Sequence, residues 1–386
     1  MENKVSETIK KHFGTIPEPR LERTRLYELP EILFIAICAI ICGAESWEDV
    51  ADFGRDQEAW LRTVLPLPNG IPSHDTFRRV FGLINAVAFQ KSFISWVQAV
   101  SRLTQGQVIA VDGKKPRGSQ DKGIGKGAID MVSAWATGNQ LVLGQVKVDD
   151  KSNEITAMPE LLRMLVITGC IVTTDALGCQ VEVAQTCVDQ HADYVLALKE
   201  NQGNLHQDVK MLFADLETSQ YQAYPNDYAH SFDNTHGRAE QRQCWTIADP
   251  EILQQLRGAN RWPNLSCVAQ VRRTYQDGSE QKREDRFFIS SLSGQGQQLL
   301  GAVRSHWGVE NNLHWVLDIA FREDDCRVRK DQGPQNFAVL RHIALNLLKA
   351  EKTSKRSIKS KRLQAAWKTD YREKVLAGFA NLSELV

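Results

Sequence analysis

Hydrophobic residues recur with helical spacing through the first hundred positions of the chain. The most apolar run, residues 32–44, has 13 residues between Glu31 and Glu45. A run of this length suits a buried helix and is too short to span a bilayer. Further helical patterns follow it. We therefore predict an all-helical N-terminal domain over residues 1–104.

One helical pattern in this domain has a candidate nucleic-acid role. Residues 73–84 begin with Ser73, which can cap a helix, and carry Arg78 and Arg79. A short helix, a turn and this second helix resemble a unit that reads DNA. A helical packing layer explains the same pattern, and the sequence alone leaves both interpretations open.

The pattern changes from helical to strand-like near residue 106. Apolar runs and helical segments then predict the order β-β-β-α-β-α-β. Such an order is typical of a mixed sheet with helices on its faces. A polar, strand-like stretch interrupts it at about 200–292, and we interpret this stretch as a β-rich insertion. Helical spacing returns at 294–322 and 335–350, so the predicted α/β domain covers 105–350.

The chain has no overall charge that would attract a charged partner, because the formal net charge of the 386 residues is zero. An acidic partner would therefore need a local basic surface. Two segments offer one: the loop 113–127 and residues 352–362, which begin a predicted basic C-terminal tail at 351–386. A solvated loop explains either segment equally well.

The cysteines, the N-terminal residues and a glycine-rich loop indicate which classes of protein the chain does not resemble. The eight cysteines form no CxxC pair and are expected to be reduced, buried thiols. No secretory signal is visible, so we expect a cytoplasmic protein without a membrane partner. The loop GIGKG lacks the spacing of phosphate-binding and dinucleotide-binding motifs, so no nucleotide cofactor is expected.

Two aspartates stand at the ends of predicted strands. Asp112 ends the run VIAVD and Asp175 ends IVTTD. In open α/β sheets, ligands bind at this edge. Two carboxylates there suit Mg²⁺ or Mn²⁺, and a pair of such ions can assist phosphoryl transfer. Taken singly, each aspartate is also ordinary turn chemistry.

Helix geometry selects a third carboxylate from the stretch HWGVENNLHWVLDIAFREDD (306–325). The apolar stripe of this helix must face the sheet, and Glu310 continues that stripe. On a continuous helix Asp318 is rotated away from Glu310, and Glu323 lies on the far side. An alternative is a zinc site, because His306, Glu310 and His314 follow at i, i+4 and i+8. The oxygen-rich aspartate pair favours hard ions instead.

At this point the chain resembles a known family. Asp112, Asp175 and Glu310 resemble the DDE triad of insertion-sequence transposases with a ribonuclease-H-like core. The chain is more narrowly similar to the H-repeat-associated group found beside Rhs elements. The likeness covers nearly the whole chain, including the motifs PNGIPSHDTFRRVF, AVDGKK, KSNEITAMPELL, TTDALGCQ, HGRAEQR and HWGVENNLHWVLD.

The resemblance implies a metal-dependent enzyme that cleaves and joins DNA strands. Asp112, Asp175 and Glu310 would hold Mg²⁺ or Mn²⁺. Water would attack a phosphodiester at the element end, and the freed 3′-OH would attack target DNA. The implied partners are the terminal inverted repeats, target DNA and a second copy of the chain as a homodimer on DNA. An inactive DNA-end-binding remnant and a stand-alone nuclease are the alternatives.

Candidate DNA contacts surround this predicted site. The wider transposase superfamily often shows Y-x2-R-x3-E-x6-K around the glutamate, where this chain has Val303, His306 and Leu317, with Arg304 displaced by two. His306 or Arg304 would then substitute for the missing arginine. The residues we expect to contact DNA are Lys114, Lys115, Lys199, Asn201, Arg238, Arg242, Arg304, His306 and Trp307.

Overall fold

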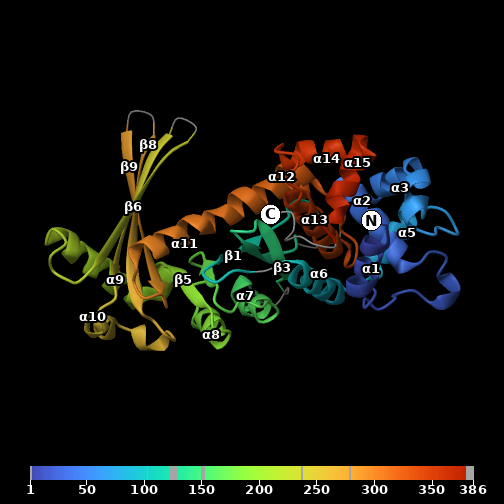
Figure 1. Cartoon of the computed structure of the whole chain (residues 1–386). Helices are drawn as coiled ribbons and strands as arrows, with labels where there is room; N and C mark the ends of the chain where they lie inside the picture. Colours follow the sequence, from blue (N-terminus) through green and yellow to red (C-terminus); the bar gives the residue numbers. More distant parts are fainter. Residues whose placement is uncertain are drawn as a thin grey trace.

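The computed structural model describes residues 2–101, 103–120, 128–148, 153–235, 238–277 and 280–379. The molecule is elongated, with helices from both ends of the chain at one end and long strands at the other (Figure 1). A central mixed sheet lies between them, and the helix α11 runs from the long strands toward the helical end (Figure 1).

The N-terminal region is helical, as the periodicity predicts. Ser73 accepts a hydrogen bond from the Thr76 amide, which is the expected cap, and Ser46 forms a capping box with Asp49. The apolar run forms the buried helix α2. The six helices are α1 (Glu2–Phe13), α2 (Leu29–Ile41), α3 (Trp47–Asp56), α4 (Glu58–Val64), α5 (His74–Leu83) and α6 (Ala86–Val100).

The central sheet has the predicted element order. Three antiparallel strands are followed by two strands parallel to the first, giving the spatial order β3-β2-β1-β4-β5. This mixed sheet with flanking helices is consistent with a ribonuclease-H-like core. Its elements are β1 (Val108–Lys114), β2 (Met131–Ala136), β3 (Leu141–Lys147), α7 (Glu154–Arg163), β4 (Ile171–Thr174), α8 (Val181–Asp189) and β5 (Asp193–Leu198).

The β-rich insertion extends the same sheet. Strand β9 pairs antiparallel with β5, so the nine strands follow the order β3-β2-β1-β4-β5-β9-β8-β7-β6. The sequence pattern missed β6 because its residues, DYAHSFDNT, are mostly polar. The inserted elements are α9 (Gly203–Thr218), β6 (Asp227–Thr235), β7 (Arg238–Ile247), α10 (Pro250–Gln255), β8 (Cys267–Asp277) and β9 (Glu280–Ser290).

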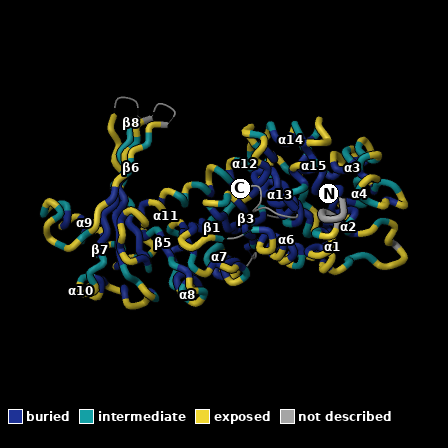
Figure 2. Tube along the Cα trace, viewed as in Figure 1, coloured by how far each residue is buried: buried dark blue, intermediate teal, exposed yellow. Residues whose placement is uncertain are grey.

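After the insertion the chain returns to helices. These are α11 (Gly296–Val309), a π-helical segment (Glu310–His314), α12 (Trp315–Phe321), α13 (Gly333–Ala350), α14 (Ile358–Trp367) and α15 (Thr369–Ala377). Helix α11 packs across the sheet against β1, β4 and β6. Helix α13 is buried almost throughout and packs against α2, α5 and α6 (Figure 2).

Residues 351–379 differ from the expected basic tail, because they fold as part of the helical end. Helix α14 packs against α2, α12 and α13. Lys361 and Arg362 are buried, and the Arg362 guanidinium donates hydrogen bonds to the carbonyls of Ile40, Ala44 and Ala320. These two cations therefore tie helices together and do not form a surface for a polyanion.

Two further sequence expectations concern the helices and the thiols. All eight cysteines lie in the described ranges and are free, six of them buried. Across the described residues, no single helix has the length and apolarity needed to cross a membrane; the bent pair α5 and α6 meets the length and composition test only when taken together.

Candidate active site

The two predicted aspartates lie side by side, where the pairing between the neighbouring strands β1 and β4 ends. Strands β1 and β4 are parallel, and Val111 of β1 is paired with Thr174 of β4. The next residues along these strands are Asp112 and Asp175. The parallel register therefore brings together two carboxylates that are 63 positions apart in the sequence.

Each aspartate is held by backbone amides. The Asp175 carboxylate accepts hydrogen bonds from the amides of Leu177 at 3.0 Å and Gly178 at 3.1 Å. Asp112 accepts one from the amide of Gly113 at 3.0 Å. The turn after β4 thus has ordinary Asx-turn chemistry, and the same bonds orient the Asp175 carboxylate.

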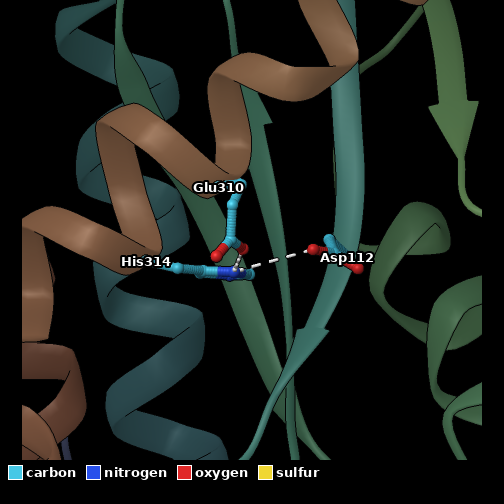
Figure 3. A group of neighbouring side chains, drawn as sticks. All are labelled: Asp112, Glu310 and His314. Carbon is cyan, nitrogen blue, oxygen red and sulfur yellow. Dashed lines mark hydrogen bonds and ion pairs between the residues drawn. The ribbon is translucent and has the colours of Figure 1, made fainter. Parts of the chain in front are cut away.

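Glu310 and His314 approach Asp112 from the π-helical segment. The amide of Trp315 donates to the carbonyl of Glu310, five residues back, so the helix has one wide turn here. The His314 Nδ1 atom lies 3.2 Å from a Glu310 carboxylate oxygen and 3.6 Å from one of Asp112 (Figure 3). One ligand atom from each of the three residues lies within 4.8 Å of the others.

The apolar stripe that selected Glu310 is buried as predicted. Leu313, Leu317, Ala320 and Phe321 all face the core. The sequence grouped His314 with Glu310 and His306 only as an alternative zinc site. The structure brings His314 to Glu310 and Asp112, whereas the Nδ1 atom of His306 lies 3.0 Å from the Thr173 hydroxyl. The π-helical turn places Glu310 and His314 on the side of the helix that faces Asp112.

The electrostatics of the site are those of crowded carboxylates. Burial, together with the charges of Asp175 and Glu310, raises the pKa of Asp112 to about 7. Burial and the nearby Lys114 lower the pKa of His314 despite the adjoining Glu310. A divalent cation would relieve this repulsion, and carboxylate oxygens are the ligands that Mg²⁺ and Mn²⁺ prefer. The donor set therefore fits a hard divalent ion.

Glu154 is a further carboxylate near the site. It begins α7 within the motif KSNEITAMPELL, and its charge acts on that of Asp112. A Cβ atom at Gly113 would lie 2.4 Å from the Glu154 carboxyl carbon, so residue 113 must be glycine for Glu154 to sit here. Burial, Asp130 and Asp175 raise the pKa of Glu154. Gly113, which follows Asp112, is the one sequence feature that could have indicated that another group approaches the backbone here.

Lys114 is placed differently from the DNA contact we expected. Its Nζ atom lies 2.6 Å from Asp318, 3.0 Å from Glu323 and 3.3 Å from the His314 carbonyl. The side chain is 12% exposed. Lys114 therefore links the strand that carries Asp112 to the helix that carries Glu310.

Glu323 also differs from the expectation of a far-side surface residue. Helix α12 ends at Phe321, and Arg322 has a left-handed backbone with φ of 48°. The chain therefore turns inward, and Glu323 is only 3% exposed and pairs with Lys114 and Arg341. Extrapolating one continuous helix past residue 321 caused the error.

Asp112, Asp175 and Glu310 line a pocket of about 910 Å³. Lys199, Lys210 and Arg286 lie elsewhere on its wall, with Trp307 from α11. The Arg286 guanidinium stacks over the Trp307 ring at 4.6 Å. The pocket thus combines carboxylates with cations and an exposed aromatic ring, which suits a phosphodiester backbone beside a metal centre.

The other expected DNA contacts are divided between the pocket and internal pairs. His306 lines the pocket, but its Nδ1 atom lies 3.0 Å from the Thr173 hydroxyl, and burial lowers its pKa to about 4. A buried imidazole beside the Thr173 hydroxyl differs from the cationic phosphate contact that we expected in place of an arginine. Asn201 donates to the carbonyl of Ala176 beside Asp175.

Three of the remaining basic residues, Lys115, Arg242 and Arg304, are paired with acids. Arg242 and Arg304 both bind the Asp233 carboxylate, and Arg242 also pairs with Glu240. Lys115 pairs with Asp130 at 2.9 Å. Arg238 begins β7, but its side chain lies outside the described part of the structure, as do residues 121–127 of the basic loop.

Comparisons with known proteins identify the family. Residues 103–347 match the model described as "Transposase DDE domain", and residues 10–97 match one described as "DDE_Tnp_1-associated". The chain is 40% identical to "Putative transposase YncI" of Escherichia coli O157:H7 over 375 residues, covering 96% of this chain and 95% of that protein. It is 39% identical to "H repeat-associated putative transposase YhhI" of Escherichia coli K12, covering 95% and 97%.

A distant structural likeness accompanies these relatives. The piggyBac transposase synaptic complex with hairpin DNA, solved by cryo-EM, matches with a TM-score of 0.40 and 11% identity, covering 98% of this chain and 78% of that one. A likeness this weak carries no argument. The family model and the relatives do, and by them this chain belongs to the DDE transposases, within the H-repeat-associated group.

Proposed function

We propose that this protein cleaves DNA at the ends of an insertion element and joins the freed strands to target DNA. The observation that carries the proposal is that Asp112, Asp175 and Glu310 line one pocket whose wall also bears cations and an aromatic ring. The pKa of Asp112, one of these three carboxylates, is raised, and the group has no evident packing role.

The reaction would proceed by two in-line displacements. In the first, a water oxygen attacks the phosphodiester and a 3′-OH leaves. In the second, that 3′-OH attacks a target phosphodiester and displaces another 3′ oxygen. Divalent ions held by Asp112, Asp175 and Glu310 would supply Lewis-acid stabilisation of the attacking and leaving oxygens.

The residues of the chain would bind and orient the DNA. Lys199 and Lys210 would contact backbone phosphates, since neither pairs with an acid in the described structure, and Trp307 offers a ring for stacking. Arg286 would hold that ring from its other side. Lys114 is left out of this set because its charge is used internally.

The test is cleavage of labelled duplexes that carry the terminal repeats, in Mg²⁺ or Mn²⁺. Asp112→Asn and Glu310→Gln should each slow nicking by about a hundredfold or more, because a metal ligand contributes several kcal/mol to the transition state. Asp189→Asn, on the exposed end of α8, is the matched control and should nick at the wild-type rate.

Three results would contradict the proposal in whole or in part. If the wild type binds the repeats but never nicks them, the protein is a DNA-end-binding remnant. If both active-site variants nick as fast as the wild type, the carboxylates are assigned wrongly. Nicking without strand joining would leave a stand-alone nuclease. The oligomeric state on DNA, expected to be a homodimer, follows from the mass of the complex.

A further inference from the structure

We infer that His314 is a nitrogen ligand to one of the divalent ions in this site, alongside Asp112 and Glu310. The inference rests on the proposed function, because it concerns the same centre. It changes the chemistry of the centre from oxygen-only to mixed oxygen and nitrogen. Nothing in the triad pattern of the family implies a histidine at this position.

The distances fit neighbouring ligands of one ion. The Nδ1 atom lies 3.2 Å from Glu310 and 3.6 Å from Asp112, and the ligand atoms of all three residues lie within 4.8 Å of one another. Bond lengths of about 2.0–2.2 Å place ligands at right angles about 3 Å apart. The three atoms are thus grouped around one position.

The placement of the ring points the same way. The His314 side chain is 6% exposed, whereas that of Glu310 is 60% exposed. Its Nδ1 atom faces only the two carboxylates, and its Nε2 atom is buried without a hydrogen-bond partner in the described structure. A ring packed only for its apolar surface has no need to direct a nitrogen at two carboxylates.

The backbone fixes this direction. The π-helical turn begins at Glu310 and ends at His314, and Lys114 donates to the His314 carbonyl at 3.3 Å. Lys114 follows Asp112 on β1 by two residues, so strand and helix are joined next to the proposed ligands. By contrast, the Nδ1 atom of His306 is turned toward Thr173.

A nitrogen ligand has a measurable consequence for metal choice. Imidazole suits softer ions than carboxylate does, and it raises affinity for Mn²⁺ more than for Mg²⁺. The ion bound by Asp112, Glu310 and His314 should therefore favour Mn²⁺. An ion held by oxygen atoms of Asp112 and Asp175 alone would lack this preference.

The experiment is pulsed EPR of Mn²⁺ bound to the full chain without DNA. Wild-type protein should show hyperfine coupling to one imidazole ¹⁴N, and labelling its histidines with ¹⁵N should replace that coupling with a ¹⁵N doublet. This measurement needs no mutation, so it does not depend on a variant that folds. His314→Gln should lose the coupling and bind Mn²⁺ at least about tenfold more weakly. His306→Gln should keep the coupling.

The outcomes separate this inference from the proposed function. Mn²⁺ that binds in the wild type, and is lost in Asp112→Asn, but shows no nitrogen coupling would overturn the histidine ligand and leave the carboxylate centre standing. Coupling that persists in His314→Gln and disappears in His306→Gln would also overturn it. If the wild type binds no Mn²⁺, both proposals fail.

Discussion

Glu323 is the centre of a buried ion network beside the active site, and replacing it tests how the site is held. Its carboxylate bridges Lys114 at 3.0 Å and Arg341 at 3.5 Å. Glu323→Gln keeps the shape and removes the charge. Arg341, 4% exposed, then has no carboxylate partner among the described residues.

The magnitude follows from what each substitution leaves behind. Removing one partner of a buried ion pair costs about 3–5 kcal/mol, because the other charge stays buried and uncompensated. Glu323→Gln should cost this much on account of Arg341. Lys114→Met should cost less, about 1–3 kcal/mol, because Glu323 keeps Arg341 and the 33% exposed Asp318 can turn to water. The predicted order is therefore Glu323→Gln worse than Lys114→Met.

The pH dependence of this network has a definite sign. Burial raises the pKa of Glu323, but Lys114 and Arg341 outweigh it, so the net pKa lies below its usual value of 4.5. The stabilisation is therefore fully present above pH 4.5 and disappears as pH falls through the lower folded-state pKa. The difference between wild type and Glu323→Gln should shrink in acid.

The assay is equilibrium urea unfolding of the metal-free protein, with the slope of the transition compared between variants. The double variant Glu323→Leu with Arg341→Met is the control, because replacing a whole buried pair by apolar residues is often close to neutral. A cost below about 0.5 kcal/mol for Glu323→Gln would refute the reasoning, as that is the range of surface substitutions.

Four further predictions follow from the same structure. At pH 8 without metal, Asp112→Asn should raise the unfolding free energy by up to about 4 kcal/mol, because an Asp pKa that rises from 3.8 to about 7 penalises the ionised folded state; the gain should shrink as pH falls below 7 and vanish below about pH 3, where the carboxyl is protonated in both states, and a gain that does not depend on pH would contradict this. Trp307→Ala should weaken binding to element-end DNA by about 1–3 kcal/mol in fluorescence anisotropy at fixed salt. Arg362→Met should destabilise the protein by about 3 kcal/mol or more in thermal unfolding, since three carbonyls lose a buried cationic donor; an unchanged transition would mean that α14 is not docked. A thiol reagent should label at most Cys42 and Cys326 in the native protein and all eight cysteines after denaturation, as the other six are buried.

Periodicity and strand ends predicted three carboxylates that the structure brings to one pocket. Asp112 and Asp175 could be paired because each follows the apolar part of a strand, and the corresponding ends of parallel neighbours lie side by side. Glu310 could be selected from five carboxylates because helical rotation depends only on spacing. These inferences are local. Each needs only the residues within one strand or helix and a general rule for how neighbouring elements pack.

The parts that failed depend on contacts between distant segments. Glu323 is buried because the chain turns at Arg322, and no spacing rule predicts a left-handed residue there. Lys114 looked like a phosphate contact because the carboxylates that neutralise it lie some 200 positions away. Arg362 looked like part of a solvated tail for the same reason.

The sequence by itself determined the order of elements in the central sheet and predicted the three carboxylates, because hydrophobic spacing and strand ends are properties of neighbouring residues. Only the tertiary structure decided which charges are available. The sequence does not show which lysines are paired with acids. In the structure, Lys199 lines the pocket, whereas Lys114 forms an internal ion pair. The tertiary structure also brought His314 to the carboxylates, because a wide helical turn and a lysine from another strand direct its ring there.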